Sequence, residues 1–260
     1  MRALAEIHKT AIVEASAELA DDVSVGPYTI IEGDVRIDAG TQIGPHVLLA
    51  SGTRIGKNCR VSNGAVLGTQ PQDLKFAGEK TTLEIGDNTT IREFATVNRG
   101  TTDHWKTVIG ENCLLMAYSH VAHDCTIGNN VILANVVNLA GHVTIDDFVG
   151  VGGVTPIHQF VHIGRHAFIG GGFRVPKDIP PFILAMGEPL RFGGLNSVGL
   201  KRRGFSDDLL AKIKKAYRII YNSKLLLVDA LKKVEDEIEP VEEITYLVSF
   251  FRDSERGVIR

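Results

Sequence analysis

The chain has 260 residues, of which 28 are Lys or Arg and 31 are Asp or Glu, so its formal net charge is -3. This balance argues against a nucleic-acid-binding protein with a basic surface. The three cysteines are odd in number and lack CxxC spacing, which disfavours a disulfide framework and a structural zinc site. Met1–Thr10 is charged, and no apolar run reaches the ~20 residues that span a bilayer. We therefore expect a cytoplasmic protein without a membrane span.

An aliphatic residue recurs at every sixth position from Ile7 to Leu67 and again from Ile109 to Val175. A parallel β-helix with three short strands per coil has this period, whereas an α-helix or a hairpin does not. One coil is then 18 residues long. The position four residues after the aliphatic one is small or β-branched and includes all three cysteines, which we interpret as packing residues rather than nucleophiles.

The repeat loses its phase at about residues 68–84 and 98–108, which we interpret as loops inserted into a continuous solenoid. A glycine often follows the aliphatic residue, as at Gly26 and Gly44, and suggests a tight corner. The repeat ends near Pro176. Residues 1–178 are therefore predicted to form a parallel β-helix.

Residues 179–260 are predicted to form a linker and a small helical domain. Pro180-Pro181 and the glycines that follow are typical of a linker. Ser206 is a good N-cap because two acidic residues come directly after it. Apolar residues then lie at helical spacing over 209–220, 226–238 and 241–251, and we interpret them as core or subunit contacts.

Polar residues gather on one edge of the predicted β-helix. Residues 18 apart stack at about the strand spacing of 4.8 Å. This register places His123, Gly141, Gln159 and Lys177 in one column. The flanking positions hold His120, Asp124, His142 and His158. Histidine can accept a proton from a hydroxyl and return it to a leaving thiolate, a neighbouring carboxylate can fix its tautomer, and an exposed N–H can stabilise an oxyanion.

Five motifs make a more specific resemblance. They are Thr69–Glu79, Ser119–Cys125, Ala140–His142, His158–Phe160 and Lys201–Phe205. Together, in this order, they resemble the UDP-N-acetylglucosamine O-acyltransferases, and the likeness runs from Ile7 to Arg260. The β-helix of these hexapeptide-repeat enzymes is left-handed, so the resemblance implies a left-handed coil here.

The resemblance also implies the reaction. A (R)-3-hydroxyacyl chain would pass from acyl carrier protein to the 3-hydroxyl of UDP-N-acetylglucosamine, the first step of lipid A biosynthesis. His123 would be the general base, Asp124 would orient it, and the Gly141 N–H would be the oxyanion donor. The residues implied to position the sugar and acyl groups are Gln72, Asp73, Lys75, His120, His142, His158 and Gln159. Asn196, Arg202 and Arg203 would contact the nucleotide end, since arginine forms bidentate hydrogen bonds with phosphates.

Further expectations concern partners and specificity. The resemblance implies a homotrimer, since a site along one edge of the prism would be left open to water in a single subunit. We expect no cofactor, because the acyl carrier protein thioester is itself a substrate. Residues 158–220 hold eleven Lys or Arg against four Asp or Glu, and we expect this segment to dock the acidic carrier protein through residues such as Arg165, Arg174 and Lys177. Gly171 corresponds to the end of the acyl tail in the resembled family, and a long acyl donor is expected to be preferred over a ten-carbon one.

Two alternative functions are compatible with the repeat. One is another hexapeptide-repeat acyltransferase or acetyltransferase that uses coenzyme A. The other is a zinc-dependent carbonic-anhydrase-like protein, because some proteins of this fold hold zinc with three histidines. The sideways drift of His142 and His158 relative to His120 and His123 disfavours that arrangement, so we expect no metal.

Overall fold

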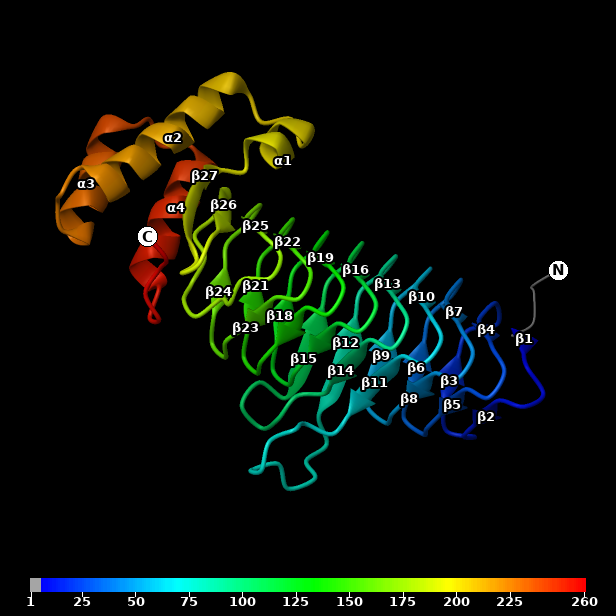
Figure 1. The fold of residues 1–260 in the computed structure, drawn as a ribbon. Coiled ribbons are helices and arrows are strands. Elements are labelled where there is room, and N and C mark those ends of the chain that lie inside the picture. The colour runs from blue at the N-terminus through cyan, green and yellow to red at the C-terminus, as the bar shows by residue number, and fades with distance from the viewer. Residues whose placement is uncertain (1–5) are drawn as a thin grey trace.

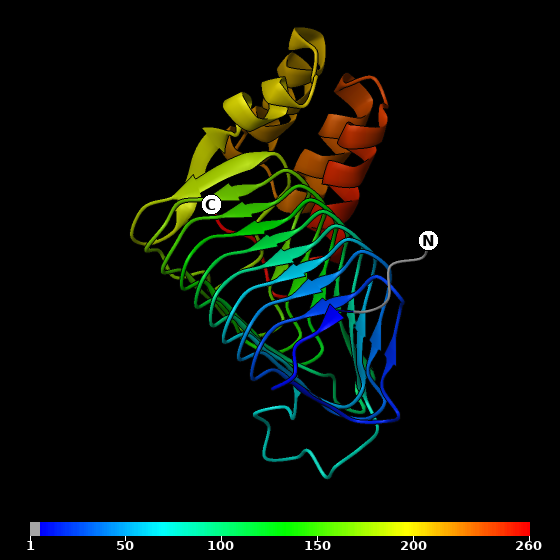
Figure 2. The same ribbon diagram turned by 90° about the vertical axis from the view of Figure 1, so that its right-hand side faces the viewer.

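A computed structural model describes residues 6–260 and shows a solenoid of short strands that carries helices at one end (Figure 1). The strands form three sheets, one on each face of the solenoid (Figure 2). The first sheet contains β1 (Glu6–Ile7), β4 (Ser24–Val25), β7 (Gln42–Ile43), β10 (Arg60–Val61), β13 (Thr90–Ile91), β16 (Leu114–Leu115), β19 (Ile132–Leu133), β22 (Gly150–Val151), β25 (Phe168–Ile169), β26 (Ile183–Met186) and β27 (Arg191–Leu195).

The other two sheets contain eight strands each. The second sheet contains β2 (Ile12–Val13), β5 (Ile30–Ile31), β8 (Leu48–Leu49), β11 (Val66–Thr69), β14 (Thr96–Asn98), β17 (His120–Val121), β20 (Asn138–Leu139) and β23 (Pro156–Ile157). The third sheet contains β3 (Glu18–Leu19), β6 (Arg36–Ile37), β9 (Thr53–Ile55), β12 (Thr82–Ile85), β15 (Lys106–Ile109), β18 (Thr126–Ile127), β21 (Thr144–Ile145) and β24 (His162–Ile163).

The strand register follows the sequence period. Glu6 pairs with Ser24, 18 residues later, and the pairing is parallel. The coil is longer in two places, because Arg60 pairs with Thr90 and Thr90 pairs with Leu114. These two coils contain the first insertion (residues 70–81) and the second insertion (residues 99–105). The sequence therefore predicted a parallel β-helix of hexapeptide repeats correctly.

The core of the solenoid is the column of repeated aliphatic residues. Ile31, Leu49 and Leu67 have no solvent-exposed surface, and each such side chain contributes about 1.5–3 kcal/mol of burial free energy. Several threonine hydroxyls at the small position are hydrogen-bonded internally, as where Thr29 Oγ1 donates to the Gly44 carbonyl at 2.7 Å. All three cysteines are buried and free, as the packing interpretation requires.

The corners differ from the sequence interpretation. The residue with left-handed backbone is the third after the aliphatic one, and it is seldom glycine, as Tyr28 (φ 59°) and His46 (φ 55°) show. The glycine that directly follows the aliphatic residue serves another purpose. A Cβ on Gly26 would lie 2.7 Å from the Gly44 carbonyl carbon, so glycine is needed because consecutive coils approach closely.

The segment expected to be a linker is instead structured. β26 adds to β25 in parallel, and β27 pairs with β26 in antiparallel fashion, which extends the first sheet. Four helices follow: α1 (Ser197–Arg202), α2 (Asp207–Asn222), α3 (Leu227–Glu237) and α4 (Glu242–Asp253). The last three match the predicted helices, and Ser206 caps α2 by accepting a hydrogen bond from the Leu209 N–H. Within residues 6–260, none of the helices has the length and apolar character needed to cross a bilayer.

The helices are anchored on the last coils. Tyr217 of α2 donates a hydrogen bond from its hydroxyl to the Pro181 carbonyl. Tyr246 of α4 donates to the Asp146 carboxylate and accepts a hydrogen bond from the Arg165 N–H at 3.0 Å. The helical region is therefore attached through buried polar contacts as well as apolar packing.

Candidate active site

Both insertions and the predicted catalytic residues lie on one edge of the prism. The first insertion joins β11 to β12, the second joins β14 to β15, and His123 lies between β17 and β18. Each of these connections runs from the second sheet to the third. We call this corner the histidine edge. Its residues come from consecutive coils, so the 18-residue stacking predicted from the sequence positions them correctly.

His123 and Asp124 form a hydrogen-bonded pair. His123 Nδ1 lies 2.8 Å from Asp124 Oδ2. An ionised carboxylate only accepts hydrogen bonds, so Nδ1 carries the proton and Nε2 has a free lone pair. The His123 side chain is 12% exposed and that of Asp124 is fully buried. The pair therefore presents one basic nitrogen to the surface of the histidine edge.

The second insertion holds the Asp124 carboxylate. Thr101 donates to it from its N–H at 2.8 Å and from its hydroxyl at 2.7 Å, and the His104 N–H donates at 3.3 Å. Burial alone would raise the pKa of Asp124, but the hydrogen bonds from Thr101 and His123 outweigh it and hold this pKa below its usual range. The carboxylate is thus ionised at neutral pH. Sequence reasoning missed Thr101 and His104, because an insertion has no repeat register from which to infer contacts.

Gly141 lies directly beneath the His123 ring. A Cβ at position 141 would lie 2.7 Å from His123 Cε1 and 2.8 Å from Nε2. Only glycine therefore leaves room for the imidazole. Among the described residues, no acceptor bonds to the Gly141 backbone N–H, which is free to bind a ligand beside His123.

His142 completes the cluster. Its ring stacks on Phe160 with 4.4 Å between centroids and meets the His123 ring edge-on at 5.1 Å. Asp103 of the second insertion places Oδ2 3.1 Å from His142 Nδ1. Burial lowers the pKa of His142 and outweighs the opposite effect of Asp124, so the ring is neutral at pH 7.

The other predicted histidines are near the same edge but have different partners. His120 Nδ1 lies 2.7 Å from the Thr96 hydroxyl, and burial, aided by His123, lowers the His120 pKa. His158 is exposed, and its Nδ1 lies 2.9 Å from an Arg256 guanidinium nitrogen near the C-terminus. Gln159 is exposed beside it.

The first insertion projects away from the coil that carries it (Figures 1 and 2). Asp73 Oδ1 accepts a hydrogen bond from the Lys75 N–H at 2.9 Å, which shapes its tip. Gln72 and Lys75 are exposed, and Leu74 is exposed completely. The structure thus places these predicted substrate residues on the histidine edge but directs them outward.

Comparison with known proteins bears on this arrangement. A family model described as UDP-N-acetylglucosamine O-acyltransferase, domain 2, matches residues 178–259, and the bacterial transferase hexapeptide model matches 34–69 and 106–141. A relative from Thiobacillus denitrificans, named acyl-(acyl-carrier-protein)–UDP-N-acetylglucosamine O-acyltransferase, is 49% identical over 99% of this chain and 100% of its own. A relative of the same name from Thermodesulfovibrio yellowstonii is 48% identical over 98% of this chain and 99% of its own.

Solved structures give the same result. The UDP-N-acetylglucosamine acyltransferase from Bacteroides fragilis superposes with a TM-score of 0.96 and 45% identity, covering 97% of this chain and 99% of that one. The LpxA structure from Acinetobacter baumannii has a TM-score of 0.94 and 44% identity, covering 98% and 99%.

The chain belongs to the UDP-N-acetylglucosamine O-acyltransferase family. The resemblance drawn from the five sequence motifs is confirmed.

The remaining residues implied by that family lie away from the histidine edge of the same chain. Gly171 follows β25 of the first sheet, so it lies on the corner between the first and second sheets. Asn196 is the N-cap of α1 and accepts a hydrogen bond from the Gly199 N–H at 3.2 Å. Arg203, just after α1, places its guanidinium 4.4 Å from the centre of the Phe148 ring, and Arg202 is exposed. One chain alone does not bring these residues to His123.

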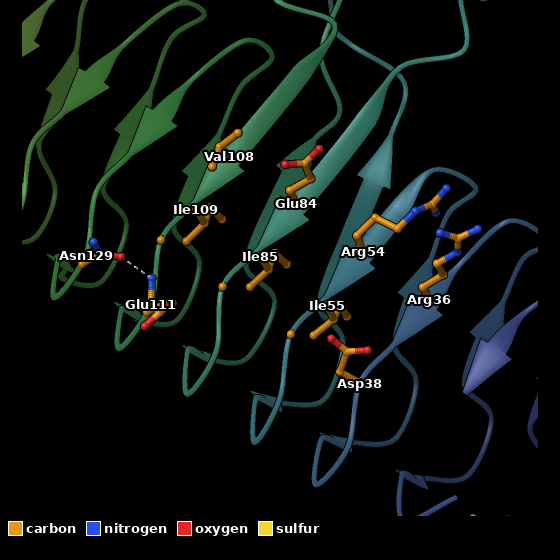
Figure 3. A pocket seen from close by; sticks show the side chains of 13 residues that line it. Arg36, Asp38, Arg54, Ile55, Glu84, Ile85, Val108, Ile109, Glu111 and Asn129 are labelled. Carbon is orange, nitrogen blue, oxygen red and sulfur yellow. Dashed lines mark hydrogen bonds between the residues drawn. The ribbon is translucent and has the colours of Figure 1, made fainter. Parts of the chain in front are cut away.

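A second hollow is unsuited to acyl transfer. It runs over β6, β9, β12 and β15 of the third sheet (Figure 3). Three of its charged side chains form ion pairs: Arg36 with Glu18, Arg54 with Asp34, and Glu84 with Lys106. It contains neither a histidine nor a cysteine, so the histidine edge is the better candidate for an acyltransferase centre.

Proposed function

We propose that this chain transfers a (R)-3-hydroxyacyl group from acyl carrier protein to the 3-hydroxyl of UDP-N-acetylglucosamine, the first step of lipid A biosynthesis. Membership of the family supports the assignment of these two substrates. The observation that carries the mechanism is the His123–Asp124 pair with the free Gly141 N–H beside it.

The proposed reaction needs no covalent enzyme intermediate and no cofactor. His123 Nε2 removes the proton of the sugar 3-hydroxyl as the oxygen attacks the thioester carbonyl carbon. The Gly141 N–H donates a hydrogen bond to the oxyanion that forms on the carbonyl oxygen. As the oxyanion collapses, the C–S bond breaks, and the proton held by His123 passes to the departing thiolate. The ionised Asp124 stabilises the imidazolium between these steps.

The proposal includes a homotrimer with a left-handed coil, as the family membership implies. Two features of the chain support sharing of sites between subunits. The first insertion carries Lys75 outward from the histidine edge, where a neighbouring chain can receive it. Gly171 and Arg203 lie on other corners, so a neighbour's residues are needed to bind the acyl tail and the nucleotide of the same substrate pair. His120, His142, His158 and Gln159 would position the sugar and acyl groups.

Docking of the acidic carrier protein is assigned to the basic segment 158–220. Arg174 and Lys177 are exposed and suit this role. Arg165 is less available, because it contacts Glu242 at 3.2 Å and lies over the Tyr246 ring. Charge reversal at Arg174 and Lys177 should lower kcat/KM and weaken its dependence on salt, and unchanged values would exclude this face.

An acyl-transfer assay tests the proposal. The protein is incubated with UDP-N-acetylglucosamine and 3-hydroxyacyl carrier proteins of graded length, and mass spectrometry locates the new ester. His123→Ala should lower kcat by about 10²–10⁴-fold while the fold persists, because the ring lies outside the aliphatic core and supplies the base. A normal kcat in the variant would show that another group is the base, and transfer from coenzyme A alone would contradict the donor.

A further inference from the structure

We propose that Asp103, His104 and His142 form a Zn²⁺ site on the histidine edge, distinct from the catalytic pair. Asp103 and His104 belong to the second insertion, and His142 belongs to a regular coil of the β-helix. The sequence offered no such set, because His104 has no place in the repeat register. The site is also distinct from a three-histidine zinc site of the carbonic-anhydrase kind.

The ligand atoms have suitable spacing. Asp103 Oδ2 lies 3.1 Å from His142 Nδ1 and 3.7 Å from His104 Nε2, and one ligand atom from each residue lies within 4.8 Å of the others. Neighbouring ligands of a tetrahedral zinc with bonds of ~2.1 Å are about 3.4 Å apart. The three groups therefore need only small side-chain adjustments. Two nitrogens and one carboxylate oxygen leave a fourth position for water.

The hydrogen bonds around His104 and His142 leave one nitrogen of each ring free to bind a cation. His104 Nδ1 lies 3.2 Å from the Asp124 carbonyl oxygen, so Nδ1 carries the proton and leaves the lone pair on Nε2, facing Asp103. Zinc-bound histidines commonly donate their second nitrogen to such a carbonyl. His142 Nδ1 is buried and makes no hydrogen bond of proper geometry to any described residue, although Asp103 is close. A cation would satisfy this nitrogen.

The neighbouring set of His123, Asp124 and His142 is a weaker alternative. Its atoms also lie within 4.8 Å of one another. However, the Asp124 oxygens already accept hydrogen bonds from Thr101, and His123 Nδ1 already pairs with Asp124. A cation there would have to displace those bonds. The Asp103 set requires no comparable loss.

Occupation of the site has a consequence for catalysis, and this part rests on the proposed function. The His142 ring is 5.1 Å from the His123 ring. A dication bound to His142 would oppose the positive charge that His123 acquires when it takes a proton, and it would also withdraw His142 from the substrate. Zn²⁺ should therefore inhibit acyl transfer reversibly.

Cobalt substitution tests the site without reference to activity. Co²⁺ added to the full-length protein should give the intense visible absorption of a tetrahedral site, and Zn²⁺ should abolish it. Asp103→Asn, which keeps the side-chain shape, and His104→Ala, which keeps the backbone N–H to Asp124, should each weaken binding about 10-fold or more. His46→Ala, which removes an exposed histidine from another corner, should leave it unchanged. Equal affinity in Asp103→Asn and the parent protein, or no such absorption, would overturn the proposal.

Inhibition is measured separately. Zn²⁺ should lower the transfer rate of the parent protein and of His46→Ala, and a chelator should restore it. Asp103→Asn should resist the same concentration. If the cobalt spectrum appears but Zn²⁺ does not slow transfer, the link to catalysis is wrong. If the protein has no transferase activity, the spectrum still decides whether the cation site exists, so the two proposals fail separately.

Discussion

At the scale of single residues, His123, the proposed base, is positioned from two sides. Asp124 fixes the tautomer of His123 from within its own coil, and Gly141 supports the ring from the next coil. The stacking register was enough to predict these neighbours, because each coil repeats after 18 residues. It could not predict that Asp124 is held by Thr101, which belongs to a coil of different length.

Gly141→Ala should impair catalysis without unfolding the protein. The added Cβ would meet His123 Cε1 at 2.7 Å and must push the ring away from its position. We expect kcat to fall by at least about 10-fold, because a base displaced by a fraction of an ångström loses its alignment. Gly150→Ala is the matched control, since its Cβ would meet only the exposed Phe168 ring on another face. Equal kcat in the two variants would show that the glycine contact does not position the base.

At the scale of secondary-structure elements, the six-residue repeat predicted the strands of the solenoid, and the helical spacing of apolar residues predicted α2, α3 and α4. The hairpin of β26 and β27 was not predicted, because its glycines and prolines resemble those of a linker. α1 has only six residues, too few to show a helical period. The second insertion was predicted only as a loop, although it supplies three residues around His123 and Asp124: Thr101, Asp103 and His104.

The contact between the solenoid and the helical region should weaken in acid through His166. Its ring stacks on Phe148 at 4.8 Å and meets Phe205 at 5.0 Å. Burial, with smaller effects from Arg203 and Arg165 that outweigh Asp147, lowers the His166 pKa to about 4. The unfolded chain, with a histidine pKa near 6.5, binds this proton first, so the free energy of unfolding falls as pH drops from about 6.5 to about 4.

His166→Phe should remove that part of the pH dependence, since phenylalanine keeps the stacking and cannot be protonated. Urea unfolding between pH 7 and pH 4.5 measures it, with His46→Phe as the control on another corner. A pH slope identical in His166→Phe and the parent protein would contradict the assignment.

At the scale of the whole molecule, the corner that carries Gly171 is separate from the histidine edge of the same chain. In the proposed homotrimer, an effect of Gly171 on acyl length would therefore act across a subunit interface. Gly171 is also close to its own neighbour, because a Cβ there would lie 2.9 Å from the Gly153 carbonyl oxygen. From the sequence alone, a glycine at position 171 is explained equally well by room for the acyl tail and by close packing against Gly153.

Gly171→Met should shift the donor preference toward shorter acyl chains without abolishing transfer. Each methylene that loses its burial costs about 0.8 kcal/mol, so long donors should lose kcat/KM more than ten-carbon donors. Gly171→Ala should show a smaller shift, and circular dichroism checks that both variants fold. A length profile that is the same in all three proteins would place the determinant elsewhere.

The most direct test of a shared site is complementation between two variants that are each expected to be impaired. His123→Ala removes the proposed base, and Lys75→Ala removes a charged side chain from the first insertion. If a site combines His123 of one chain with Lys75 of another, mixing the two proteins under conditions of subunit exchange should form some sites in which both residues are intact. We expect the mixture to show transferase activity well above the sum of the two separate samples. Activity equal to that sum after proven exchange, or a fully active monomer in sedimentation, would contradict it.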